Sequence, residues 1–213
     1  MTLLKNRSLE DFSGELAASS AAPGGGSAAA LSGALGAALV SMVCRLTLGK
    51  KEYEEYEEEL REVLALSEDL RKNLVNAVDV DAAAYGLVME AFALPKQTEE
   101  EKTVRREAIQ KAFREACESP RKTSFWCLEV LRLCARVSGK VNVNAASDLG
   151  VGANQALAGL EGAAMNVLIN LPSIKDDEYT DLLREEVEEI QDEGRILKTG
   201  VMREVLAYIG GAD

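Results

Sequence analysis

The chain contains no histidine among its 213 residues. A Ser-His-Asp or Cys-His nucleophile needs an imidazole as its general base, and most zinc sites use at least one histidine ligand, so the sequence excludes both kinds of site. Any proton transfer must therefore fall to carboxylate, lysine, tyrosine or cysteine side chains.

Positive charge is also scarce. The chain has 24 Lys and Arg residues against 36 Asp and Glu residues, for a formal net charge of -12. Binding to nucleic acid depends on clustered Lys and Arg, and the sequence has no dense cluster, so we expect no nucleic-acid partner. With 47% hydrophobic residues, the chain is long enough to bury a real core, and we expect one domain over residues 1–213.

Only four cysteines occur, at Cys44, Cys117, Cys127 and Cys134, and none forms a CxxC pair. The first residues also lack the apolar core of a secretory signal. We therefore expect reduced, mostly buried thiols in a cytoplasmic protein. A zinc site made of the four thiolates is the alternative, although their spacing gives it little support.

The chain has only four prolines, 5% aromatic residues and no alternating β-branched runs, so we expect no strands. Helical periodicity and capping signals predict about seven helices in an all-α, up-and-down bundle. Thr98 and Glu101 form a capping box, and Ser119-Pro120 is expected to begin a separate helix. The first expected helix begins at Ser8, and the next five cover about 27–48, 52–92, 98–117, 119–137 and 147–171. The stretch 176–208 is expected to form the last helix or a broken pair of helices.

The segment from Ser27 to Cys44 is uncharged over 18 residues, the lower limit for a membrane span. Its many Ala and Gly residues contribute little transfer free energy, and two serines interrupt it. We therefore expect no membrane span but a buried central helix. Small residues at Ala30, Ala34 and Ala38 would let another backbone approach closely, within the bundle or at a subunit interface.

Asp81 is the most informative single residue, because a helix would place its carboxylate in an apolar stripe. Burial there would raise the pKa of the carboxyl toward neutrality unless a cation or hydrogen-bond donors keep it ionised, and either state suits a general acid or base. The alternative is that Asp81 caps or supports a neighbouring helix. Its expected neighbours are Leu74, Ala77, Val78, Ala84, Tyr85 and Val88.

Glu161 repeats this pattern on a later helix, where it also faces a largely apolar stripe. A pair with a lysine or arginine is at least as good an explanation as a catalytic role. Asn166 lies on the same helix and can offer hydrogen bonds inward. We expect these two side chains to support the site.

Two further stretches carry candidate binding residues. Gly24, Gly25, Gly26 and Ser27 precede a helix, where backbone N–H groups can approach an anion, although flexible glycine-rich helix starts are common. Asn144, Ser147 and Asp148 concentrate short polar side chains at another helix start, where the simpler explanation is that Ser147 or Asp148 is the N-cap. Lys50 and Lys96 are candidate contacts for an anionic ligand, or solvated charges.

Read together, these stretches resemble the formiminotetrahydrofolate cyclodeaminase/methenyltetrahydrofolate cyclohydrolase family. The resemblance implies an all-α, typically dimeric enzyme that acts on a small-molecule folate without a metal or redox cofactor. The matching segments, in chain order, are PGGGSAAALSGALGAALVSMV (23–43), LTLGKKEY (46–53), residues 79–112, NVNAASDLGVG (142–152) and EGAAMNVLINLPSIKD (161–176).

The resemblance implies two activities and a role for each candidate residue. Cyclodeaminase activity, which releases ammonia to give 5,10-methenyltetrahydrofolate, is placed first, and cyclohydrolase activity, which opens that ring to 10-formyltetrahydrofolate, is placed second. A non-catalytic helical bundle that binds folate or a partner is the alternative of another class. The implied roles are proton transfer for Asp81, contact with the pterin or reacting carbon for Asn144, Ser147 and Asp148, the pocket wall for Gly24, Gly25, Gly26 and Ser27, and contact with folate carboxylates for Lys50 and Lys96.

Overall fold

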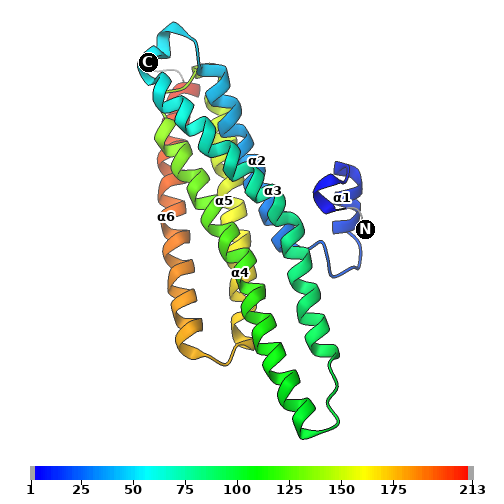
Figure 1. Ribbon diagram of the computed structural model, residues 1–213. Helices are drawn as coiled ribbons and strands as arrows, with labels where there is room; N and C mark the ends of the chain where they lie inside the picture. The colour runs from blue at the N-terminus through cyan, green and yellow to red at the C-terminus, as the bar shows by residue number, and fades with distance from the viewer. Residues whose placement is uncertain (1–2, 211–213) are drawn as a thin grey trace.

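The computed structural model describes residues 3–210, which form an all-α bundle without strands. Five long helices run up and down, and a short N-terminal helix lies beside them (Figure 1). The helices are α1 (Leu9–Leu16), α2 (Gly25–Thr47), α3 (Glu57–Ala93), α4 (Glu99–Val137), α5 (Ala146–Leu168) and α6 (Asp177–Ile209), with short 3-10 turns at Leu4–Asn6, Lys51–Tyr56, Val143–Ala145 and Leu171–Ser173.

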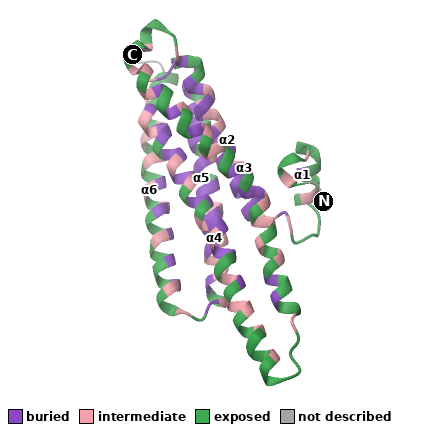
Figure 2. Ribbon diagram, viewed as in Figure 1, coloured by how far each residue is buried: buried purple, intermediate pink, exposed green. Residues whose placement is uncertain are grey.

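The bundle has two packed layers. α3 and α4 cover one side of α2 and α5, and α6 runs along α4 and α5 (Figure 1). Buried residues gather where these layers meet, whereas the end of the α3–α4 hairpin extends beyond the bundle and is mostly exposed (Figure 2). The expected all-α bundle is confirmed.

Glycines bring α2 and α5 into backbone contact. A Cβ atom added to Gly159 would lie 2.7 Å from the carbonyl oxygen of Ala29 and 2.8 Å from the nitrogen of Gly33. A Cβ atom on Gly36 would lie 2.8 Å from the carbonyl oxygen of Gly152. Another helix, α5, therefore does approach the small-residue helix closely, but at Ala29, Gly33 and Gly36 and not at the expected Ala30, Ala34 and Ala38.

α2 is long and apolar enough to cross a membrane by length and composition alone, with a mean hydropathy of 1.8. Within the bundle, however, 61% of its most apolar window is buried. The prediction that this segment is a central core helix is confirmed, because α3, α4 and α5 all pack against it.

The expected helix boundary at Ser119-Pro120 is wrong. α4 is continuous from Glu99 to Val137 with Pro120 inside it, so the described chain has six α-helices instead of about seven. Proline cannot donate the backbone hydrogen bond to the carbonyl four residues earlier, here Ala116. Packing outweighs this loss, because Ser119 and Pro120 are both buried against the core. The capping box of Thr98 and Glu101 at the start of α4 is confirmed.

The N-terminal segment is held on the side of α3. The backbone N–H of Leu4 donates to Oδ1 of Asp79 at 2.6 Å, and Phe12 of α1 packs with Ala77 and Val78. Asp79 therefore anchors this segment to α3. Ser8 accepts from the N–H of Asp11, which confirms the expected start of α1.

Candidate functional site

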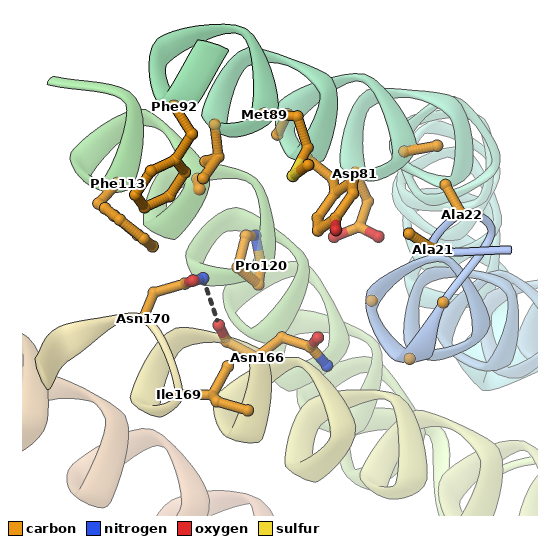
Figure 3. A pocket seen from close by; sticks show the side chains of 18 residues that line it. Ala21, Ala22, Asp81, Met89, Phe92, Phe113, Pro120, Asn166, Ile169 and Asn170 are labelled. Atoms are coloured by element: carbon orange, nitrogen blue, oxygen red, sulfur yellow. Dashed lines mark hydrogen bonds between the residues drawn. The ribbon is translucent and has the colours of Figure 1, made fainter. Parts of the chain in front are cut away.

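An open cavity of about 450 Å³ lies where the start of α2 meets α3, α4 and the end of α5 (Figure 3). Asp81 and Asn166 face it from opposite walls, on α3 and α5 (Figure 3). Its lining consists of Ala21, Ala22, Gly24, Gly25, Gly26, Asp81, Ala82, Ala84, Tyr85, Val88, Met89, Phe92, Phe113, Ala116, Pro120, Asn166, Ile169 and Asn170.

The carboxylate of Asp81 lies directly over the first turn of α2. A Cβ atom on Gly26 would overlap both carboxylate oxygens, so only glycine at this position leaves room for them. The turn has no side-chain cap at Gly24, and the first N–H groups of a helix carry partial positive charge. The Asp81 carboxylate therefore lies directly against the N-terminus of α2.

Ser27 connects this turn to α3. Its buried hydroxyl donates to the carbonyl oxygen of Val78 at 2.9 Å and lies 3.3 Å from Oδ2 of Asp81. Burial raises the pKa of the Asp81 carboxyl above its ordinary value, and hydrogen bonds from the hydroxyl and N–H of Ser27 oppose this with a smaller effect. A carboxyl tuned in this direction can hold or release a proton closer to neutral pH.

Two asparagines form the opposite wall. Nδ2 of Asn166 donates to the carbonyl oxygen of Gly162 at 2.8 Å, and Nδ2 of Asn170 donates to the carbonyl oxygen of Asn166 at 2.9 Å (Figure 3). A Cβ atom on Gly25 would lie 3.3 Å from Nδ2 of Asn166, so this amide also meets the start of α2. The wall offers amide groups of the kind that hydrogen-bond a heterocycle.

The outer half of the cavity is apolar and aromatic. The rings of Phe92 and Phe113 pack edge to face with centroids 6.0 Å apart, and Tyr85 and Met89 also line this half. Aromatic and thioether side chains suit a flat aromatic ligand. No lysine or arginine is among the described lining residues, so an anionic part of a ligand must find its positive partners outside this lining.

Gly26→Ala tests the packing of Asp81 against α2. The added methyl group must displace the carboxylate, so we expect activity at this site to fall about 10²-fold, the cost of a misplacement of about 1 Å. The matched control is Gly86→Ala on α3, where a Cβ atom meets nothing within 4 Å. Equal rates for the two variants would show that the position of Asp81 does not matter.

Several candidate residues lie at the other end of α2, far from this cavity. α2 has 23 residues, so its ends are about 33 Å apart. Asn142 connects the start of α5 to the C-terminal end of α2, because its N–H donates to Oγ1 of Thr47 at 2.9 Å. We call Lys50, Asn144, Ser147 and Asp148, which all lie at this end, the far group.

The start of α5, which carries three residues of the far group, is capped differently from the prediction. Ala145 is the N-cap of α5 and makes no side-chain capping bond, so the alternative that Ser147 or Asp148 is the N-cap is wrong. The preceding turn is closed instead by Asn142, whose side chain accepts from the N–H of Asn144. This leaves Asn144 and Ser147 exposed and Asp148 half-exposed.

Two other candidates also lie outside the cavity lining. Lys96 is exposed in the connection between α3 and α4. Glu161 accepts from Nε of Arg195 on α6 at 2.9 Å, which confirms the alternative that it pairs with a cation. Its side chain is half-exposed and not buried in an apolar stripe as expected, because α6 reaches it with an arginine.

The sequence reasoning missed the aromatic half of the cavity. Met89, Phe92 and Phe113 were not singled out, although Tyr85, Met89 and Phe92 follow Asp81 at helical spacing on the same side of α3. That apolar stripe continues onto the exposed end of the α3–α4 hairpin, where no core is expected. An apolar stripe outside the core indicates a ligand site, and this pattern could have identified the aromatic residues.

The four cysteines are buried and free. Within residues 3–210, no three His, Cys, Asp or Glu side chains lie close enough together to hold a metal ion, so the four-thiolate alternative is wrong. Burial raises the pKa of the Cys44 and Cys117 thiols to about 11, which keeps them protonated and unreactive at neutral pH.

Comparison with known proteins places the chain in a family. The sequence profile of the formiminotransferase-cyclodeaminase family matches residues 8–189. The chain belongs to this family. It is 44% identical over 199 residues to the methenyltetrahydrofolate cyclohydrolase of Methylorubrum extorquens, covering 93% of each chain.

Other members differ in length. The formimidoyltransferase-cyclodeaminase of Mus musculus is 35% identical over 90% of this chain, which spans only 36% of the mouse protein. The crystal structure of a formiminotetrahydrofolate cyclodeaminase from Thermotoga maritima superposes with a TM-score of 0.79 at 28% identity, covering 98% of each chain. The all-α fold described above is thus the fold of a solved member of the family.

Proposed function

We propose that the chain is an enzyme of folate one-carbon metabolism that acts on the carbon bridging N5 and N10 of tetrahydrofolate. The observation that carries this proposal is a half-buried carboxyl with a raised pKa, set over a helix N-terminus in a cavity with an aromatic outer half. We put hydrolysis of 5,10-methenyltetrahydrofolate first, and the similarity to a methenyltetrahydrofolate cyclohydrolase over 93% of each chain supports this order.

The hydrolysis requires a group that first accepts a proton and later donates it. Water bonds to the methenyl carbon and gives one proton to the Asp81 carboxylate, which forms a tetrahedral carbon bearing a hydroxyl group and both nitrogens. The bond from this carbon to N5 then breaks, the Asp81 carboxyl returns its proton to N5, and the hydroxyl proton leaves to solvent as the formyl carbonyl forms. A carboxyl whose pKa is raised toward neutrality can perform both transfers.

The first turn of α2 and the amide wall have separate roles in this reaction. N–H groups of the turn favour negative charge that develops near the attacking oxygen. Asn166 and Asn170 are placed to hydrogen-bond the pterin ring, and the rings of Phe92 and Phe113 cover apolar surface beside it. These steps move protons and no electrons, in keeping with the proposal that no redox cofactor takes part.

Cyclodeamination is the second candidate, and the match to the Thermotoga maritima cyclodeaminase favours it. N10 attacks the formimino carbon and forms a tetrahedral carbon of the same kind. The formimino nitrogen must gain two protons to leave as ammonia, one from N10 and one from solvent. Asp81 can relay both protons, so the same site serves either reaction.

An absorbance assay tests the proposed function. The protein is incubated with 5,10-methenyltetrahydrofolate and, separately, with 5-formiminotetrahydrofolate, and the methenyl absorbance is followed. We expect accelerated loss of absorbance from the first substrate, and its appearance from the second would assign cyclodeamination. If the protein changes neither rate, the chain is not an enzyme of this class and the non-catalytic bundle is the better description.

A cytoplasmic, homodimeric enzyme remains part of this proposal. The four cysteines of the chain are free, as expected of a reducing compartment. Sedimentation of the purified protein reports the oligomeric state directly.

A further inference from the structure

We propose that Asn166 and Asn170 select the heterocycle that the cavity binds, because their side-chain oxygens accept hydrogen bonds from the 2-amino edge of a reduced pterin. The inference rests on the proposed function and deepens it. The wall formed by these two amides at the end of α5, which we call the amide wall, recognises the pyrimidine half of the substrate, and the bridging carbon then faces Asp81. Both asparagines determine specificity and take no part in proton transfer.

Both amides are held by the helix end that carries them. Nδ2 of Asn166 donates to the carbonyl oxygen of Gly162 at 2.8 Å, and Nδ2 of Asn170 donates to the carbonyl oxygen of Asn166 at 2.9 Å. Each amide thus bonds to the carbonyl four residues before it. Turning over either amide would bring its oxygen against that carbonyl oxygen, and two acceptors cannot form a hydrogen bond. The end of α5 itself therefore fixes the orientation of both amides.

This orientation leaves the side-chain oxygens for a ligand. Among residues 3–210 neither Oδ1 atom accepts a hydrogen bond, and both side chains are half-buried in the cavity lining. Figure 3 shows the side-chain oxygen of Asn166 on the side that faces Asp81, with the nitrogen turned away from it. Each Nδ2 keeps a second N–H, but its bond to the backbone holds it on the helix side of the amide. The amide wall therefore presents mainly acceptor atoms.

The hydrogen-bond donors of the lining lie on the other walls. They are the N–H groups in the first turn of α2 and the hydroxyl of Tyr85 on α3. The described lining has no lysine or arginine, and the ionised carboxylate of Asp81 can only accept. A ligand that lies against the amide wall must therefore bring N–H donors of its own.

A reduced pterin has such donors along one edge. Its 2-amino group, N3 and N8 all carry hydrogen, whereas N5, which holds the reacting carbon, lies across the bicyclic ring from the 2-amino group. In 5,10-methenyltetrahydrofolate the bridging carbon shares a positive charge with N5 and N10. A ring whose 2-amino edge lies on Asn166 and Asn170 thus directs its cationic bridge toward Asp81, which faces the cavity from the opposite wall (Figure 3).

A pair of folates that differ in one substituent of the pyrimidine ring tests this recognition. 5-Formyltetrahydrofolate has the 2-amino group, and its 2-deamino-2-oxo analogue has an oxygen in that place. We expect the wild type to bind the amino ligand at least about 10-fold more tightly, because the analogue brings an acceptor against acceptors. The Kd of each ligand is measured by calorimetry, which does not depend on turnover. Equal affinities, tighter binding of the analogue, or no binding of either ligand would overturn the inference.

Asn166→Leu and Asn170→Leu remove the acceptors one at a time. We expect each variant to bind the amino ligand about 10-fold more weakly and the oxo analogue no more weakly than the wild type, so the preference for the amino ligand shrinks. The matched control is Asn154→Leu, since Asn154 is exposed on α5 outside the cavity lining and should leave the preference unchanged. A variant of the amide wall that keeps the full preference of the wild type contradicts the role of that residue.

Asn166→Asp separates recognition from folding. Aspartate has nearly the shape of asparagine and keeps an acceptor oxygen toward the cavity, so we expect this variant to retain the preference that Asn166→Leu loses. If Asn166→Asp loses the preference as well, the amide wall does not act through its acceptors. The comparison of the two ligands on the wild type decides the question even if a leucine variant does not fold.

Turnover keeps the two proposals apart. On 5,10-methenyltetrahydrofolate we expect the leucine variants of the amide wall to raise KM about 10-fold and to leave the midpoint of the acid limb of kcat/KM unchanged, because Asp81 keeps its surroundings. A wild type that is inactive on this substrate and on 5-formiminotetrahydrofolate contradicts the proposed function. An active wild type that does not distinguish the amino ligand from the oxo analogue contradicts the role of the amide wall alone.

Discussion

Asp81→Asn is expected to lower turnover by about 10²-fold or more, the usual contribution of a positioned general acid or base. Asparagine has nearly the shape of aspartate but cannot take up and return a proton, so the cavity is preserved while the proton transfer is lost. The rate is measured from the methenyl absorbance at saturating substrate. An Asp81→Asn enzyme with full activity would refute the proposed role of this carboxyl.

The same variant is expected to be at least as stable as the wild type at neutral pH. Burial raises the pKa of Asp81 in the folded state, so the folded protein binds this proton more tightly than the unfolded chain does. Wild-type stability therefore falls as the pH rises from the ordinary carboxyl pKa through the raised one. Asparagine does not ionise, so its advantage should appear only above that window and disappear at lower pH, in urea unfolding curves measured across the range.

Gly159→Ala is expected to lower the free energy of unfolding by roughly 1–3 kcal/mol, as overpacking in a tight core commonly does. The new Cβ atom would lie 2.7 Å from the carbonyl oxygen of Ala29 and 2.8 Å from the nitrogen of Gly33. Both are backbone atoms of α2, so the two helices must separate to relieve the contact. Urea unfolding measures the change.

Gly200→Ala is the matched control for this effect. Gly200 also lies inside a helix, α6, but a Cβ atom there meets nothing within 4 Å. Alanine should stabilise that helix by up to about 1 kcal/mol, because glycine has the greater backbone entropy when unfolded. If Gly159→Ala is as stable as the wild type, the close contact of α2 with α5 is not what holds the bundle together.

Most helix ends could be predicted from the sequence, because the interactions that set them lie within a few residues. The capping box of Thr98 and Glu101 and the cap at Ser8 satisfy N–H groups within four residues. Pro120 was misinterpreted for the same reason: its effect on the helix is local, but the packing that overrides it involves α2, α3 and α5. That packing has no signature within the segment itself.

The candidate site was only half predictable. The position of Asp81 in an apolar stripe follows from helical spacing, and so does the raised pKa of its carboxyl. Its contact with Gly26 depends on how α3 crosses α2, which no short stretch of sequence determines. Treating Lys50, Asn144 and Ser147 as neighbours of Asp81 also ignored the length of α2, which keeps them apart within one chain.

The pH dependence of kcat/KM tests the role of Asp81 most directly. The wild-type enzyme and Asp81→Asn are compared on 5,10-methenyltetrahydrofolate, and the pKa of the Asp81 carboxyl is measured separately by NMR. We predict that the wild-type rate falls on the acid side with a midpoint at that pKa, above the ordinary aspartate value, and that the variant lacks this limb. An identical acid limb in both proteins would contradict proton transfer by Asp81.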